Sequence, residues 1–349
     1  MIHERNQENM NPSTTSTTGT SIGSSHSQAN FFSKIVSGLV MLVGAALVAT
    51  TLISNLFTVG PAFENLITDF RPALTQTSID TARSDIASLS AVQTEFSTKL
   101  VPALSQQLKM TPEQFNGFVS QNFPAVAAGI GALPTAVPAF DGLINILDQQ
   151  RPLFASADAI PTKTLPATTV PWGLFGAGIL IFIIGLTILR SPKAGGAAAL
   201  VLGLLVVTLS MFLSLPGKSA DADKLNANLK PVYTQALVDN SKASLATIGA
   251  MGAEMQTTML PALAMQLKMS PVQLQGFLGS NFPATANALQ TMPASMERFN
   301  GLVKVFDENL SNYNTLKPIG LAKIVLIMIF AGGFTALLGA ALLISKRRM

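Results

Sequence analysis

The stretch LVPALSQQLKMTPEQFNGFVSQNFPA, from Leu100 to Ala125, recurs in altered form as MLPALAMQLKMSPVQLQGFLGSNFPA, from Met259 to Ala284. The offset is 159 residues, the difference between 259 and 100, and it holds without a gap from about residue 70 to residue 154. Chance does not keep a register over that length. We therefore interpret the chain as a tandem duplication whose two copies pack on one another.

The composition indicates where the copies lie. Charged residues make up 11% of the 349 residues, whereas soluble domains carry about 25%. Four apolar stretches occur, at Ile35–Phe57, Val170–Leu189, Gly195–Leu215 and Leu321–Ile344. Each is close to the roughly 20 residues that a helix needs to cross a membrane. The sequence thus predicts an all-α integral membrane protein with four transmembrane helices in two parallel tandem repeats of span, extracytoplasmic helical domain and span.

The first apolar stretch reads as a retained span and not as a cleaved signal peptide. A polar segment of 34 residues precedes it, and no small-x-small cleavage site follows in ISNLFTVGP. The stretch is also longer than the apolar core of a signal peptide, which has about 7 to 15 residues. We therefore count it as the first transmembrane helix.

Basic residues near the spans predict their orientation. Lys34 precedes the first span, Arg190 and Lys193 flank the short link between the second and third, and the chain ends in SKRRM. Short basic segments stay in the cytoplasm, so both termini are predicted to be cytoplasmic and both long loops extracytoplasmic. Loops of this size can form a helical core without disulfides, and the chain has no cysteine. We expect a bacterial plasma membrane.

These features predict nine segments. They are a disordered cytoplasmic tail (1–33), transmembrane helix 1 (34–58), extracytoplasmic helical domain copy 1 (59–169), transmembrane helix 2 (170–190), a cytoplasmic link (191–194), transmembrane helix 3 (195–215), extracytoplasmic helical domain copy 2 (216–318), transmembrane helix 4 (319–345) and a cytoplasmic C-terminus (346–349). Because each copy enters the membrane from the same side, a pseudo-twofold axis along the membrane normal is expected to relate them.

Each long loop is predicted to be a helical bundle. Apolar residues from Ile79 to Leu108 recur with a period near 3.6, and the second copy repeats them. Thr111 and Pro112 then match a helix N-cap and first position, as do Ser270 and Pro271. The Phe-Pro pairs that close both quoted stretches are expected to end these helices, and a third helical segment follows. The Pro/Thr-rich residues 155–172 are expected to form an extended strap in the first copy only.

Catalytic and metal chemistry have no residues to support them. The two histidines, His3 and His26, lie in the polar tail, and neither cysteine nor a phosphate-binding glycine loop occurs. The acidic pairs Glu95/Glu254 and Asp148/Asp307 recur in both copies and could act as paired carboxylates, but an interpretation as exposed helix-surface charges explains them at least as well. We expect no enzyme, no cofactor and no metal. The scattered net charge of +4 also argues against nucleic acid.

Six residues are weak candidates for contact with a partner or a lipid. Lys109, Asn122, Lys268 and Asn281 are polar positions retained in both copies, for which solvated capping roles are the competing interpretation. Met255 and Met259 belong to a methionine-rich face of the second copy. That face either lines a pliable apolar groove or forms ordinary core.

The transmembrane stretches favour packing over transport. Lys323 is their one ionisable candidate, and a lysine near a span end reaches the interface. Several glycines instead allow close helix approach, within this bundle or to a partner's spans.

Two functions are consistent with these observations. In the first, the duplicated extracytoplasmic domain docks envelope or membrane protein partners as an accessory or assembly subunit. In the second, the protein binds or transfers a lipid or small apolar ligand in a groove between the two outer bundles. Membrane lipids contact the protein in both cases, and the oligomeric state is open.

The absence of cysteine makes the predicted topology directly testable. A Ser270→Cys variant is expected to react with a membrane-impermeant maleimide in intact cells, because residue 270 lies in an outer loop. A Ser191→Cys variant is expected to stay unlabelled until the cells are opened. The reverse pattern would overturn the orientation.

Overall fold

The computed structural model describes the backbone of residues 23–345 and the side chains of residues 31–345. The predicted tail residues 1–22 and the C-terminal residues 346–349 lie outside the described part. Helices make up 87% of the described residues, and no strand occurs among them. The predicted all-α class is therefore confirmed.

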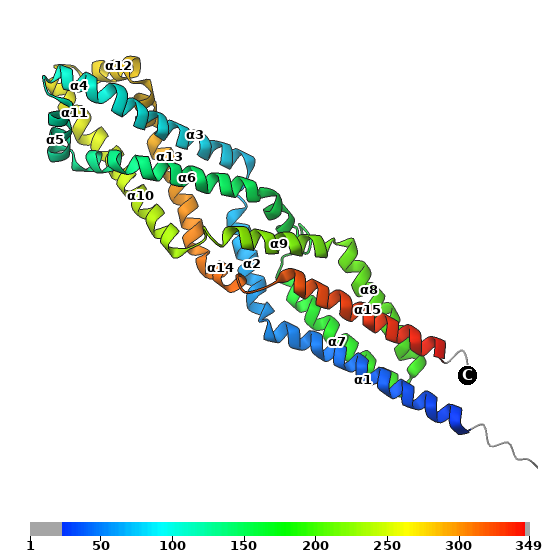
Figure 1. Ribbon diagram of the computed structural model, residues 1–349. Helices are drawn as coiled ribbons and strands as arrows, with labels where there is room; N and C mark the ends of the chain where they lie inside the picture. Colours follow the sequence, from blue (N-terminus) through cyan, green and yellow to red (C-terminus); the bar gives the residue numbers. More distant parts are fainter. Residues whose placement is uncertain (1–22, 346–349) are drawn as a thin grey trace, which may run out of the picture. The chain divides into compact units, whose positions relative to one another are not determined.

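The helices follow one another with short connections (Figure 1). They are α1 (Gly23–Ile53), α2 (Leu56–Phe70), α3 (Gln76–Glu95), the π-helical turn η1 (Phe96–Leu100), α4 (Val101–Gln107), α5 (Pro112–Asn122), α6 (Pro124–Ala157), α7 (Thr169–Arg190), α8 (Pro192–Phe212), α9 (Leu215–Leu229), α10 (Gln235–Glu254), the π-helical turn η2 (Met255–Met259), α11 (Leu260–Gln266), α12 (Pro271–Asn281), α13 (Pro283–Glu308), α14 (Leu310–Leu316) and α15 (Leu321–Ser345).

Five helices in the described part are long and apolar enough to cross a membrane, so the chain has the character of a membrane protein. Four of them, α1, α7, α8 and α15, overlap the stretches that the sequence predicts as spans, although α1 ends at Ile53 and α8 at Phe212, a few residues before the predicted ends. The fifth is α6, which the sequence places in the first helical loop. Its mean hydropathy is 1.4, against 2.2 to 2.3 for the other four.

Some element ends differ from the predicted bounds. Helix α1 begins at Gly23 and not at residue 34, and α8 begins at Pro192, so the predicted link at 191–194 is nearly all helical. A proline is tolerated in the first turn of a helix because the N–H that it lacks would be unpaired there.

The described residues form two compact units. The smaller unit contains residues up to Leu47, residues 177–207 and residues from Phe330 onward. The larger unit contains residues 48–176 and 208–329, which we call its first and second halves. The apolar helices α1, α7, α8 and α15 contribute residues to both units.

In the smaller unit, helices pair through glycines that leave no room for a side chain. Gly44 of α1 lies against the backbone of Gly178 and Phe182 in α7, where an added Cβ would be 2.6 Å from the Gly178 oxygen. Gly203 of α8 lies in the same way against Gly332 of α15. Such close approach increases van der Waals contact and is typical of helix pairs in membranes.

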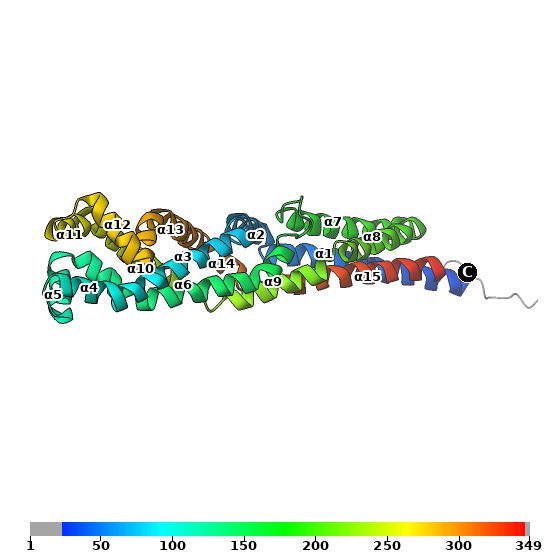
Figure 2. The same ribbon diagram turned by 90° about the horizontal axis from the view of Figure 1, so that it is seen from above.

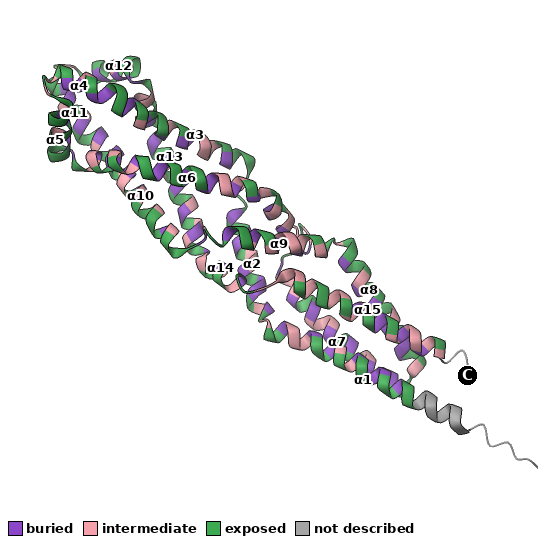
Figure 3. Ribbon diagram, viewed as in Figure 1, coloured by how far each residue is buried: buried purple, intermediate pink, exposed green. Residues whose placement is uncertain are grey.

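The outward faces of these helices are apolar. Leu42 is 65% exposed, Val201 63% and Leu337 69%, while Val40 and Ile181 on the inner faces are fully buried (Figure 3). Exposed apolar surface of this extent is unfavourable in water and is favourable in lipid. The faces therefore indicate a membrane location.

The elements of the two halves of the larger unit begin and end at matching residues. Helices α3 and α10 start at Gln76 and Gln235, 159 residues apart, and the same offset relates η1 to η2, α4 to α11 and α5 to α12. Thr111 and Ser270 form capping boxes at the starts of α5 and α12. Phe123 and Phe282 end these helices outside the α region, as predicted from the prolines that follow.

The π-helical turns have a local cause in the sequence. Pro102 and Pro261 each lie two residues after the end of a turn, and a proline has no N–H to donate to the carbonyl four residues earlier. The wider turn relieves the resulting clash, and the Val101 N–H bonds to the Phe96 oxygen five residues back.

The halves pack with α3 on α13 and α6 on α10, as both views show (Figures 1 and 2). Glu95, at the end of α3, accepts a hydrogen bond from the Thr285 N–H in the first turn of α13, at 2.7 Å. Glu254, at the end of α10, accepts one from the Val126 N–H in the first turn of α6, at 2.8 Å. The interpretation of these glutamates as exposed surface charges is wrong, because Glu95 is only 5% exposed and each one caps a helix of the other half.

Aromatic and charged contacts complete the junction. Phe140 and Phe299 face each other with ring centroids 5.3 Å apart. Arg298 of α13 donates to both oxygens of Asp85 in α3, at 2.7 and 2.8 Å. Phe306 packs edge-on against Phe70 of α2, with a centroid distance of 5.0 Å.

A glycine pair in α6 tests the packing of α6 on α10. We expect Gly129→Ala to destabilise the protein by about 1–3 kcal/mol, because the added methyl would overlap the Met251 side chain. Gly131→Ala is the control, since no atom lies near its added methyl and alanine is the better helix former. Thermal unfolding in detergent measures both. An equal effect of the two variants would contradict this crossing.

Candidate functional site

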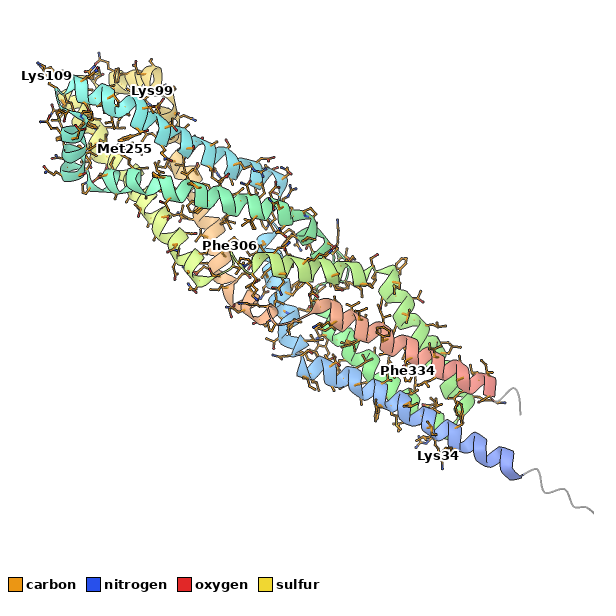
Figure 4. All side chains as sticks on the ribbon, in the orientation of Figure 1. Lys34, Lys99, Lys109, Met255, Phe306 and Phe334 are labelled. Atoms are coloured by element: carbon orange, nitrogen blue, oxygen red, sulfur yellow. The ribbon has the colours of Figure 1, made fainter. Side chains whose placement is uncertain are left out.

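Lys109 and Lys268 lie at tight helix ends with left-handed backbone, at φ 56° and 53°. They follow α4 and α11, where the next residue closes the turn: the Met110 N–H bonds to the Ser105 oxygen at 2.8 Å. Glycine is usual at such a position because the left-handed region strains other residues. The side chains of both lysines are exposed at one end of the larger unit, where Figure 4 labels Lys109.

Asn122 and Asn281 satisfy the ends of their own helices. The side-chain amide of Asn122 donates to the Phe118 oxygen, and that of Asn281 to the Phe277 oxygen, each at 2.8 Å. Each bond joins the amide to a carbonyl one turn earlier, so both amides are engaged within their own helix ends. The geometry therefore supports the capping interpretation that competes with a contact role.

Met255 and Met259 belong to the core of the larger unit. They are 4% and 3% exposed and lie in η2, and Figure 4 labels Met255 within the bundle. Neither side chain is open to a ligand at the surface. The structure thus brings the six candidates to one end of the larger unit without joining them into a site.

A groove at the same end was not predicted from the sequence. It lies between α11, α12 and the first turns of α13 and has a volume of about 430 Å³. Leu260, Leu274, Leu278 and Leu289 are among its apolar wall residues, and the amides of three glutamines, Gln256, Gln275 and Gln290, supply polar groups. Its lining carries no charged side chain among the described residues, so its chemistry suits a neutral, largely apolar partner.

Two exposed apolar side chains lie on the helices that form this groove. Met265 of α11 is 76% exposed and Val272 of α12 is 77% exposed. The corresponding residues of the first half are Gln106 and Glu113, which are polar. Apolar exposure at this end is thus specific to the second half, and only a comparison of the two copies residue by residue could have indicated it.

A second groove of about 410 Å³ lies between α3, α6 and α13 and therefore joins the two halves. Its lining contains the Asp85–Arg298 ion pair, and Asp85 raises the pKa of the Arg298 guanidinium by accepting its hydrogen bonds. Nearby, bonds from Arg83 and Arg151 lower the pKa of Asp148. These charges are paired, and no cluster of three potential metal ligands occurs within the residues that the structure describes.

The strained lysines can be tested for a purely structural role. We expect Lys109→Gly and Lys268→Gly each to stabilise the protein by about 0.5–1 kcal/mol, because glycine adopts the left-handed region without strain. Lys99→Gly in η1 is the control and should destabilise by about 1 kcal/mol, since its backbone is helical. Chemical denaturation provides the measurement. A loss of stability in Lys109→Gly would show that its side chain makes a contact worth more than the strain.

Comparison of the chain with models of known protein families and with the sequences of curated proteins gave no match.

Proposed function

We propose that the chain consists of two tandem copies, each made of a membrane span, an extracytoplasmic helical domain and a second span. The recurring elements support this arrangement, and so do recurring contacts. Glu64 of α2 accepts a hydrogen bond from the Ala167 N–H just before α7, at 2.6 Å. Asp223, 159 residues after Glu64, accepts one from the Leu321 N–H at the start of α15, at 2.8 Å. The span that closes each copy is thus capped by an equivalent acid.

The packing of α6 supports four spans over five. Helix α6 packs against α3, α5, α9 and α10, and 39% of its most apolar window is buried, against 22 to 33% in the other four helices. Its last turns carry Asp148 and Arg151, which pair with each other, and its interior holds Pro134 and Pro138. With the N-terminus in the cytoplasm, a span at α6 would reverse the expected maleimide labelling of Ser270→Cys and Ser191→Cys, so the experiment distinguishes the two topologies for that orientation.

We further propose that this plasma-membrane protein docks an envelope partner as a non-enzymatic accessory or assembly subunit. The observation that carries this proposal is the apolar groove of the second half, with Met265 and Val272 exposed on two of the helices that form it. In the proposed topology the groove lies on the extracytoplasmic domain. Its amides and apolar walls fit an apolar segment of a partner protein.

The alternative is a lipid-binding function in a groove between the two outer bundles. A groove does join the halves, but its lining includes Asp69 as well as the Asp85–Arg298 pair. The proposed methionine face is buried in the core. These features make an apolar lipid chain a poorer fit there than a polar ligand.

A photocrosslinking experiment tests the docking proposal. A photoreactive phenylalanine analogue at Val272 is expected to crosslink one partner in native membranes, whereas the same analogue at Glu113 of the first half is the matched control. The pair of changes Met265→Gln and Val272→Glu, which copies the first half, should weaken copurification of that partner about tenfold or more. Loss of buried apolar area gives this magnitude.

Equal crosslinking from Val272 and Glu113 would argue against a site in the second half. The same conclusion would follow if the doubly changed protein, folded as judged by its melting temperature, kept its partner at the wild-type ratio. A Gln106→Ala variant should leave the ratio unchanged.

A further inference from the structure

A small apolar cavity lies at the end of the larger unit that holds the first turns of α7 and α15. Its walls come from α2, the 158–168 segment, α7, α9 and α15, and they include Val59, Val170 and Ile324. Ser219 supplies the only hydroxyl among the described lining residues, and that hydroxyl donates to the Pro216 oxygen at 3.2 Å. The cavity, about 70 Å³ in volume, thus has no free polar group in its lining.

A polar recess of about 200 Å³ adjoins this cavity, since Phe63 and Ile160 line both. The recess contains two cations, Arg71 and Lys163, and two carboxylates, Glu64 and Asp158. An apolar cavity that opens beside a charged recess is the arrangement that an amphiphile requires, because each part of the ligand then meets matching chemistry.

Three of the four charged groups in the recess already have hydrogen-bond partners. Glu64 accepts the Ala167 N–H, and Arg71 donates from Nε and Nη2 to one oxygen of Asp158, at 3.3 and 2.7 Å. Those bonds raise the pKa of the Arg71 guanidinium. The exposed Lys163 makes no hydrogen bond or ion pair with any residue in the described part of the chain. Among the described residues, Lys163 is therefore the one charged group of the recess whose hydrogen-bond donors are free, and a phosphate oxygen can accept from them.

A tryptophan indicates where this end meets the bilayer. Trp172, the one tryptophan of the chain, lies in the first turn of α7, is 66% exposed and packs edge-on against Phe57 with ring centroids 4.8 Å apart. Exposed tryptophan is enriched at the membrane–water interface, where its ring is half in lipid and its N–H is in contact with water. The cavity, lined by Val170 and Pro171 of the same turn, lies at that level.

We propose that this end binds an anionic glycerophospholipid from the adjoining leaflet, with part of one acyl chain in the cavity and the phosphate at Lys163. The inference rests on the proposed membrane placement of α7 and α15 and is independent of the docking groove. The small cavity holds a few methylene groups, and the rest of the lipid stays in the bilayer. The lipid would connect the 158–168 segment to the two spans.

Native mass spectrometry of the full-length protein in detergent tests the proposal, with dioleoylphosphatidylglycerol and dioleoylglycerol as the added probes. Wild type is expected to retain one phosphatidylglycerol. Lys163→Gln should bind it about tenfold more weakly, the loss expected for one charge-assisted hydrogen bond, and should bind dioleoylglycerol unchanged. Val170→Phe, which fills the cavity, should weaken binding of both probes.

Two control variants show whether the effects are specific to the Lys163 charge and to the volume of the cavity. Lys99→Gln removes a cation at the opposite end of the larger unit, and Ile179→Phe enlarges an exposed residue on α7 away from the cavity; both should bind as wild type. If Val170→Phe fails to fold, Ile324→Phe fills the same cavity from α15. Wild-type affinity in both Lys163→Gln and the folded cavity variant would overturn the proposal. Labelling at Ser270→Cys and crosslinking from Val272 would then be unaffected, so failure here is distinct from failure of the topology or of docking.

Discussion

Two carboxylates that cross between the halves are the contacts on which the larger unit depends. Glu95 and Glu254 each end one helix and accept the N–H of the third residue of a long helix in the other half. The positive end of the helix dipole strengthens such a bond, and burial strengthens it further because water does not compete. Each glutamate directly precedes a π-helical turn, and each accepting helix begins after a Phe-Pro break. The glutamate, the π-helical turn that follows it and the Phe-Pro break before the accepting helix therefore occur together at each end of the junction.

The local features were predictable from the sequence, and the contacts between them were not. Thr111, Pro112 and the Phe-Pro pairs act within one or two turns of chain, so their residue types are enough to indicate a helix start or stop. Glu95 finds its partner 190 residues away, and no pattern near Glu95 indicates that partner. The sequence places α6 in the first loop, yet α6 also has the length and hydropathy of a possible span, because a buried helix of a bundle can be as apolar as a weak membrane span.

The candidate site shows the limit of reasoning from residues that the copies share. Shared positions such as Lys109 and Asn122 close helix ends, and a duplicated fold must keep them to fold twice. A binding surface that serves one partner needs to exist only once. The groove is therefore best located by positions where the copies differ in chemistry, as Met265 differs from Gln106 and Val272 from Glu113.

The junction between the halves also contains both kinds of position, those that the copies share and those where they differ. Reciprocal caps would pair any two such halves, including halves of different chains, because each half offers both the acid and the helix start. The Asp85–Arg298 pair exists in one direction only, since the corresponding residues are Ser244 and Ala139. A buried charge without its partner is unfavourable by several kcal/mol, so a first half that met another first half would leave Asp85 uncompensated. The ion pair thus favours the packing of a first half on a second half. Covalent linkage of the two halves in one chain favours the same pairing.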